Sequence, residues 1–435
     1  MKLALFCICA FTLLTVLAAK PLLGPKTAVL LGNIDERHKY SQFFDSFTKK
    51  GYDLHFLRAD DQDITLKKFG EYLYDQAILF VGKSEEINVV DVLDFIDSGR
   101  SVIVATSPDL SDSVRELAIG CGIEFDEQGT SVIDHFNFKN GDKEHTSIIA
   151  NDFCDIPTVL GDFEQDKKDI LFKGIGMEVK KNSPLNYRLL VAPPTSYSYF
   201  VDEKITEKPF VIGEGITLVS ALQTRGDARV LFSGSIDMFS NDFFNTEHGN
   251  TLFCKEIASW AFNEKGFLRF RDFTHHTVNS QVKQDSYRIK DDIEFSVIIE
   301  EYDLEKGWKP YVANDVQIEY VMLSPYVRQN LVNNPETGKF STKLSLPDKH
   351  GTFKFRLQYH KRGYRFLEKV EEIPLKPFWH NQYERFIPVA YPYYLSAILM
   401  LVGFFIFSII FLYHKDDNVE KKNKKAPQKN NKKNN

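Results

Sequence analysis

Hydrophobic and polar positions follow two different rhythms along the chain, and the rhythm changes near Gly266. From Lys26 to about Gly266, short apolar runs are separated by segments in which apolar residues recur every three or four positions. The runs predict buried strands, and the wider spacing predicts amphipathic helices. Because the two alternate, this part favours a doubly wound α/β domain, with a parallel sheet covered by helices on both faces.

Glycines mark the expected ends of two helices in this domain, at Gly51 and Gly99. Ser84 is expected to cap the second helix, which Glu85 and Glu86 would begin. The predicted strands cover residues 27–32, 52–58, 76–82, 101–107, 187–192, 209–222 and 228–234, and the predicted helices cover residues 35–50, 84–99 and 250–262.

Beyond Gly266 apolar and polar residues alternate one by one, most clearly in residues 352–360. This alternation predicts strands with one face on a core and one in water. Similar segments occur at residues 292–300, 316–323 and 339–346. Several such strands in succession predict an all-β, β-sandwich-like domain.

Both ends of the chain carry apolar segments. Residues 1–19 have one charge at Lys2, then an apolar run and small residues, which is typical of a signal peptide cut after Ala18 or Ala19. A buried first helix is the alternative, although no start or stop signals frame it. Residues 394–413 carry no charge, and as a helix they would reach about 30 Å, enough to cross a bilayer.

The lysines after this segment predict the orientation. The last 22 residues (414–435) hold eight lysines against three acidic residues, and a lysine excess beside a membrane span marks the cytosolic side. The predicted organisation is a signal peptide at 1–19, a lumenal α/β domain at 20–266, a lumenal β-sandwich-like domain at 267–391, a transmembrane helix at 392–413 and a cytosolic tail at 414–435.

The distribution of net charge along the chain narrows the classes of molecule that we expect as partners. The whole chain carries −6; the tail holds +5 (8 minus 3) and Lys2 adds +1, so the remainder carries −12 (−6 − 5 − 1). Such an acidic surface disfavours nucleic acid as a partner. The lysine-rich tail either contacts anionic lipid or is simply solvated. After removal of Cys7 and Cys9 with the signal peptide, Cys121, Cys154 and Cys254 allow at most one intramolecular disulfide, in three possible pairings.

Two motifs suggest phosphate or metal binding. Gly82-Lys83-Ser84 follows a predicted strand as the end of a phosphate loop does, but such a loop needs glycine at position 77, which is Ala77. We therefore expect only a turn there. Asp61 and Asp63 are weak candidates for a site holding Mn²⁺ or Mg²⁺. The alternative is that they begin a helix over residues 63–75, since acidic residues suit a helix N-terminus.

No catalytic set is visible among the nucleophiles and histidines. Cys121 is expected at the exit of a helix and buried. His275 and His276 are adjacent in a predicted strand, so they would face opposite ways and could not easily share a metal. Ser235 lacks the flanking glycines of a nucleophile elbow.

Segments along nearly the whole chain resemble the family of 48 kDa subunits of the oligosaccharyltransferase complex. They include FVGKSEEI (80–87), RVLFSGSIDMFSN (229–241), YRIKDDIEFSVIIEEY (287–302) and YERFIPVAYPYYLSAILM (383–400). The resemblance implies a type I membrane protein of the endoplasmic reticulum with a Rossmann- or amidotransferase-like N-terminal domain. It also implies a non-catalytic, cofactor-free role beside a multispanning catalytic subunit. Lys432 and Lys433 resemble a dilysine retrieval signal.

Two hypotheses for function remain. The first is an accessory subunit that assists complex assembly and presents donor or acceptor during N-glycosylation. The alternative is an α/β domain that itself binds or processes a sugar or diphosphate ligand. Asp61, Asp63 and Lys83 motivate it, because open sheets bind ligands at strand ends.

Overall fold

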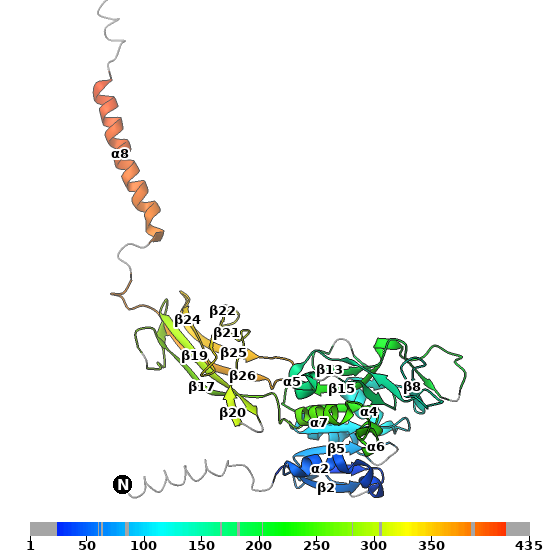
Figure 1. Ribbon diagram of the computed structural model, residues 1–435. Helices are drawn as coiled ribbons and strands as arrows, with labels where there is room; N and C mark the ends of the chain where they lie inside the picture. Colours follow the sequence, from blue (N-terminus) through cyan, green and yellow to red (C-terminus); the bar gives the residue numbers. More distant parts are fainter. Residues whose placement is uncertain are drawn as a thin grey trace, which may run out of the picture.

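The computed structural model describes residues 24–414, apart from residues 60, 62–63, 83–86, 166–167, 181–182, 202, 281, 304–306 and 384–387. The predicted signal peptide, Asp63, Lys83, Ser84, Lys432 and Lys433 therefore lie outside the described residues. Figure 1 shows an α/β domain, a β domain beside it and a single helix, α8, that stands apart from both.

A ten-stranded sheet forms the centre of the α/β domain. Five neighbouring strands are parallel, in the order β2 (Asp53–Arg58), β1 (Lys26–Leu31), β5 (Gln76–Phe80), β6 (Ser101–Ala105) and β16 (Arg229–Ser233). Antiparallel strands continue the sheet through β15 (Thr217–Gln223), β13 (Asn186–Val191) and β10 (Asp152–Phe153). Strand β12 (Met177–Val179) pairs with β15, and β7 (Ile123–Phe125) pairs with β12. The prediction of a parallel sheet is thus correct for one half only. The neighbouring strands from β13 to β16 are antiparallel because the described residues between them contain no helical crossover, which parallel neighbours require.

Helices cover both faces of this sheet, as predicted. Along β1, Val29 and Leu31 belong to one core cluster and Ala28 and Leu30 to the other. Helices α2 (Ser41–Lys49) and α7 (Asn250–Ala261) pack in the first cluster, and α3 (Val89–Asp97) and α4 (Asp112–Gly120) pack in the second. Shorter elements are η1 (Ile34–Tyr40), α5 (Pro157–Leu160), η2 (Gly161–Gln165), η3 (Gly213–Gly215), η4 (Asp237–Phe239) and α6 (Asn241–Phe244). Two of the three two-stranded sheets pair β8 (Thr130–Ile133) with β14 (Tyr197–Phe200) and β9 (Ile148–Ala150) with β11 (Ile170–Phe172).

Two local predictions in this domain are wrong. Helix α3 begins at Val89, after Asn88, whose side chain accepts a hydrogen bond from Val90 N at 3.1 Å, so the helix starts later than the expected cap at Ser84. The described residues of the predicted helix, 64–75, form no helix. They contain a hairpin of β3 (Lys67–Lys68) and β4 (Glu71–Tyr72), because Phe69 and Gly70 adopt positive φ angles of 53° and 87° and close a two-residue turn.

The second domain consists of two five-stranded sheets that enclose one core. Phe353, Phe355 and Leu357 are fully buried in it, and their neighbours along the strand face outward, so the predicted alternation is confirmed. One sheet contains β17 (Phe267–Thr277), β19 (Asp292–Asp303), β20 (Gly307–Pro310), β23 (Val332–Asn334) and β24 (Lys339–Ser345), and the other contains β18 (Tyr287–Arg288), β21 (Gln317–Val321), β22 (Pro325–Asn330), β25 (Gly351–Tyr359) and β26 (Leu367–Lys376).

A buried arginine joins the two domains. Arg229, only 1% exposed, donates hydrogen bonds to the carbonyl oxygens of Trp260 and Lys265, both at 2.7 Å, and of Gly266 at 3.0 Å. It also donates to Gly363 O at 3.3 Å, in the loop between β25 and β26. Gly363 O accepts a second bond from Trp260 Nε1 at 2.8 Å. The loop between β25 and β26 is therefore fixed to the α/β domain by buried hydrogen bonds.

Helix α8 (Tyr391–Tyr413) directly follows η5 (Pro388–Ala390), and 14 residues separate it from the last strand of the second domain, β26. None of its residues is buried, and its mean hydropathy reaches 2.8 over 18 residues. Within the described part of the chain it is the one helix long and apolar enough to cross a membrane. The predicted apolar helix is thus confirmed.

None of the three described cysteines takes part in a disulfide bond. Cys121 and Cys254 are buried, and Cys154 is half-buried. The disulfide that the sequence permits is not formed among them.

Candidate functional site

The carboxyl ends of β1 and β5 form the most suggestive crevice of the α/β domain. The two strands are neighbours, but the chain leaves β1 toward α2 on one face and leaves β5 toward α3 on the other. Where successive connections diverge in this way, the loops separate and leave an opening, and open α/β sheets bind ligands at this point. The topology thus marks this edge before any side chain is considered.

A cavity of about 260 Å³ lies at this position. Gly82 lies so close to the β6 end that a Cβ atom on it would approach Ser107 Oγ to 2.6 Å. Tyr40 forms the inner wall and packs edge-on against Phe80, with ring centroids 5.3 Å apart. The lining residues are Leu31, Gly32, Asn33, Glu36, Tyr40, Phe80, Gly82, Ser107, Ile236 and Asp237.

The cavity has an acidic character. Burial, and then the neighbouring Asp237 and Glu36, raise the pKa of Tyr40, so its hydroxyl stays protonated at neutral pH. Burial of its carboxyl group is also the main factor that raises the pKa of Asp237; Lys173 and Lys39 oppose this, and Asp242 and Glu36 add to it. Among the described lining residues there is no lysine or arginine. Carboxylates and hydroxyls without a cation suit hydroxyl groups of a ligand better than a diphosphate.

The sequence-predicted ligand residues do not line this cavity. Asp61 is exposed beyond the end of β2, at the same edge of the sheet, and Asp63 and Lys83 lie outside the described residues. In the described part of the chain, no three His, Cys, Asp or Glu side chains are placed to hold a metal ion. Sequence reasoning missed Tyr40, Ser107 and Asp237. The last two could have been found, because Ser107 is the last residue of the predicted strand 101–107 and Asp237 follows the predicted strand 228–234 by three residues.

Cys121 is placed as predicted. It is the C-cap of α4 and 7% exposed, and burial, with a smaller contribution from Asp97, raises the pKa of its thiol to about 12. A thiol with this pKa is protonated at neutral pH and is a poor nucleophile.

Ser235 and the two histidines have structural surroundings. Ser235 is buried; its Oγ donates to Lys173 O at 2.5 Å and accepts from Met238 N at 3.2 Å. His275 and His276 face opposite sides of β17, as predicted, and only His275 lies in the core. His275 Nδ1 is 2.7 Å from the hydroxyl of Tyr287.

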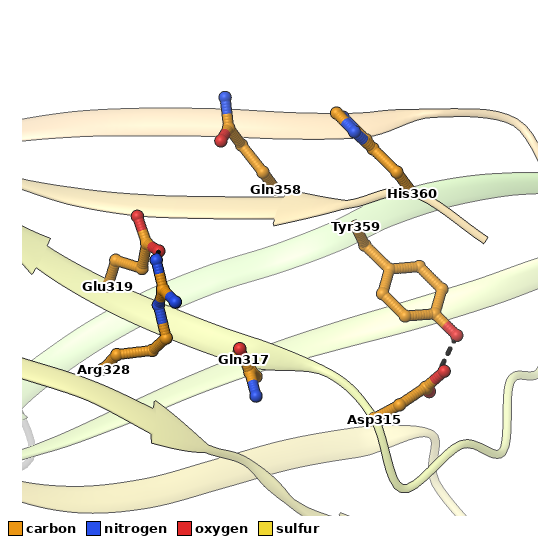
Figure 2. Close-up of a pocket in the computed structure, with 7 residues that line it drawn as sticks. All are labelled: Asp315, Gln317, Glu319, Arg328, Gln358, Tyr359 and His360. Atoms are coloured by element: carbon orange, nitrogen blue, oxygen red, sulfur yellow. Dashed lines mark hydrogen bonds and ion pairs between the residues drawn. The ribbon is translucent and has the colours of Figure 1, made fainter. Parts of the chain in front are cut away.

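A second, more open cavity of about 370 Å³ lies on the outer face of the β domain. Figure 2 shows Glu319 and Arg328 turned toward each other from β21 and β22, and the hydroxyl of Tyr359 bonded to Asp315. Glu319 also accepts a bond from Arg356 Nε at 2.8 Å, so one carboxylate bridges two arginines. The cavity is lined by Asp315, Gln317, Glu319, Arg328, Gln358, Tyr359 and His360.

Replacement of Glu319 by glutamine should lower the free energy of unfolding by about 1–2 kcal/mol at pH 7. Burial acts to raise the pKa of Glu319, but hydrogen bonds from Arg356 and Arg328 outweigh it, so the pKa lies below its usual value. The folded state therefore gains stability from the ionised carboxylate above about pH 4.3 and loses it as the pH falls through the lowered pKa. Denaturant unfolding of the full chain in detergent, followed from pH 7 to pH 3, measures the difference.

Glu372→Gln is the matched control for this change. Glu372 pairs with Lys354 at 2.7 Å, but both side chains are well exposed, so its loss should cost less than about 0.5 kcal/mol. A difference between the wild-type chain and Glu319→Gln that stays constant down to pH 3 would contradict the assigned role of the carboxylate.

Similarity to known proteins extends over almost the whole chain. The family model of the OST48 N-terminal domain matches residues 18–264, and that of the OST48 middle domain matches residues 275–415. A Danio rerio protein named dolichyl-diphosphooligosaccharide–protein glycosyltransferase 48 kDa subunit is 40% identical over 427 residues, which cover 93% of this chain and 96% of the relative.

Proteins of the same name from two other organisms are similarly close. The Arabidopsis thaliana protein is 38% identical over 409 residues, covering 90% of this chain and 93% of its own length. The Drosophila melanogaster protein is 37% identical over 415 residues, covering 90% of this chain and 92% of its own length. With both domains matched in order and the relatives aligned nearly end to end, the chain belongs to the OST48 family, the 48 kDa subunits of dolichyl-diphosphooligosaccharide–protein glycosyltransferase.

Proposed function

We propose that this chain is a non-catalytic accessory subunit of the oligosaccharyltransferase complex. That complex transfers a preassembled oligosaccharide from dolichyl diphosphate to the asparagine of N-x-S/T sequences in nascent proteins. The end-to-end match to the 48 kDa subunits carries the proposal. The structural surroundings of Cys121, Ser235 and His275 agree with it, since none is arranged as an activated nucleophile or base.

The proposal includes a place in the cell. Residues 20–266 and 267–391 form two lumenal domains of the endoplasmic reticulum, α8 crosses the membrane, and residues 414–435 lie in the cytosol with Lys432 and Lys433 as a retrieval signal. The apolar surface of α8 supports the crossing, and the lysines after it support the orientation. The partners are the other subunits of the complex, including its multispanning catalytic subunit.

Depletion of this chain from cells should destabilise the complex and leave acceptor sequences without glycan. The physical reason is that an accessory subunit contributes packing surface, so its loss exposes apolar faces of its neighbours. The measurement is the fraction of glycosylated acceptor sites in a secreted reporter, together with the amount of intact complex on a native gel.

Variants of this chain that are expressed in the depleted cells show whether the candidate cavity matters for complex assembly and glycosylation. Asp237→Asn alters the candidate cavity, and Glu372→Gln alters a solvent-exposed pair far from it. Both should restore complex and glycosylation if the role is accessory. Normal glycosylation in depleted cells without any add-back would refute the proposed function.

The second candidate function is ligand binding by the α/β domain itself, with its carboxyl edge used as in Rossmann- or amidotransferase-like domains. The cavity at the divergence of β1 and β5 favours it. The described lining offers Tyr40, Ser107 and two carboxyl groups, which suits a hydroxyl-rich sugar more than a diphosphate.

Titration of the full chain in detergent with lipid-linked oligosaccharide, with and without Mn²⁺, distinguishes the two functions. Saturable binding that Asp237→Asn weakens tenfold or more, about 1.4 kcal/mol, would support the second candidate. Equal, weak binding by both forms would leave the accessory role as the function of this domain.

A further inference from the structure

One end of the β domain carries an unusual set of exposed apolar side chains. The pairing of strands places several loops there: Thr277 pairs with Ile293, Asp292 with Ser345, and Gly351 with Leu375. These strand ends therefore lie at one edge of the domain, and the connections beyond them share it. We call this edge the anchor rim; it consists of residues 278–280, 282–286, 322–324, 346–350 and 377–383.

The anchor rim is the edge from which the chain leaves for α8. Strand β26 ends at Lys376 and α8 begins at Tyr391, so 14 residues (390 − 376) connect them. Figure 1 shows α8 beyond this end of the β domain, while the α/β domain occupies the other end. The buried bonds of Arg229 to the β25–β26 loop fix the α/β domain at that other end, away from the rim.

Large apolar side chains of the rim are exposed to an extent that a water-facing loop does not require. Leu323 is 98% exposed, Val282 is 70% exposed and Trp379 is 63% exposed. Val278 and Tyr383 add to this surface at 45% and 54%. They come from three separate connections, so the accumulation is a property of the edge and not of one loop.

Cationic side chains accompany the aromatic ones at the rim and just beside it. The guanidinium of Arg288 lies 4.8 Å from the ring centre of Trp379, and Lys349 Nζ lies 5.8 Å from that of Tyr326. Aromatic rings beside long basic side chains are the combination that proteins place at the level of lipid headgroups.

We propose that the anchor rim rests on the membrane, with Leu323, Val282 and Trp379 in the interfacial zone of the bilayer that α8 crosses. This rests on the proposed crossing by α8. The rim also contains acidic groups, such as Asp348, which pairs with Lys290 at 3.0 Å. Because both signs of charge are present, the contact relies on apolar side chains, and a neutral lipid surface satisfies it.

Val312 provides a matched control for Leu323. It is 56% exposed and follows Tyr311, whose hydroxyl is 2.9 Å from that of Tyr359 at the far end of β25. Leu323 lies beyond Val321, which pairs with Lys354 near the start of that strand. About seven residues of β25 separate the two positions, which is roughly 24 Å.

Leu323→Cys, Val312→Cys and Leu399→Cys, each made alone in a Cys154→Ser background in which Cys121 and Cys254 stay buried, test the proposal in the full chain. Each carries an environment-sensitive fluorophore, and the protein is placed in phosphatidylcholine nanodiscs with or without a shallow lipid-borne nitroxide quencher. We expect about threefold or stronger quenching at 323 and a change below about 10% at 312. Position 399, within α8, reports whether the helix is in the bilayer.

Each outcome decides the matter. Quenching at 399 and 323 but not at 312 supports the rim contact. Quenching at 399 alone overturns the rim contact and leaves the crossing by α8 intact. Shielding of the fluorophore at 323 that appears only after the sister subunits are added would have the same meaning. Equal quenching at 323 and 312 overturns it as well, because the contact would then not be specific to the rim. Absence of quenching at 399 overturns both the crossing and the rim contact.

Discussion

Replacement of Arg229 by methionine should lower the free energy of unfolding by about 3–5 kcal/mol. Methionine fills much of the same volume but donates no hydrogen bond, so four carbonyl oxygens each lose the bond from Arg229 in a largely buried place, although Gly363 O keeps its bond from Trp260 Nε1. Burial lowers the pKa of Arg229 to about 9, so the guanidinium is still charged at pH 7 and these bonds are charge-assisted.

Thermal or denaturant unfolding of the full chain in detergent measures this effect. Because the lost bonds connect the domains, we also expect the variant to unfold in two separate steps and to be cleaved more readily between residues 263 and 267. Arg225→Ala is the control, since Arg225 is exposed four residues away and should change stability by less than about 0.5 kcal/mol. Equal stability of the Arg229 variant and this control would contradict the role of Arg229.

Replacement of Gly266 by alanine should cost about 3 kcal/mol or more. Gly266 has a positive φ of 64°, which side-chain-bearing residues rarely adopt, and a Cβ atom would lie 2.4 Å from Gly363 O. The neighbour is a backbone oxygen of the interdomain loop that already accepts two buried hydrogen bonds, so it has little freedom to move.

Gly307→Ala separates the two causes. Gly307 has a similar φ of 73°, but no atom of the described residues lies within 4 Å of the position of its Cβ. Gly307→Ala should lower the free energy of unfolding only by the conformational cost, about 1 kcal/mol. The difference in unfolding free energy between the two variants then reports the contact with Gly363. Equal losses would show that no tight contact exists at the domain junction.

Sequence periodicity predicted the parallel half of the sheet and the β domain well, because burial on one or two faces leaves a direct trace in the order of apolar residues. The strands from Ile123 to Val179 were missed. They are only two to four residues long, from β10 (Asp152–Phe153) to β8 (Thr130–Ile133), so no period can be established over so few positions.

The hairpin at Phe69-Gly70 shows a different limit. The spacing of apolar residues in 63–75 fits a helix, but a left-handed turn and the burial of Leu66 select a hairpin. The prediction of the residues that line the candidate cavity failed for a third reason. Tyr40, Ser107 and Asp237 are brought together by the order of strands, and one sequence contains no direct record of that order.

The bond between Arg229 and Gly363 joins residues 134 positions apart, and this has a consequence for biosynthesis. A chain made at about 5–20 residues per second presents Arg229 roughly 7–27 seconds before its acceptor. During that interval the newly made α/β domain holds a cation near its centre without its full set of acceptors. The nascent domain must therefore wait in an incompletely closed form, open to chaperones, until the β25–β26 hairpin follows it into the same compartment.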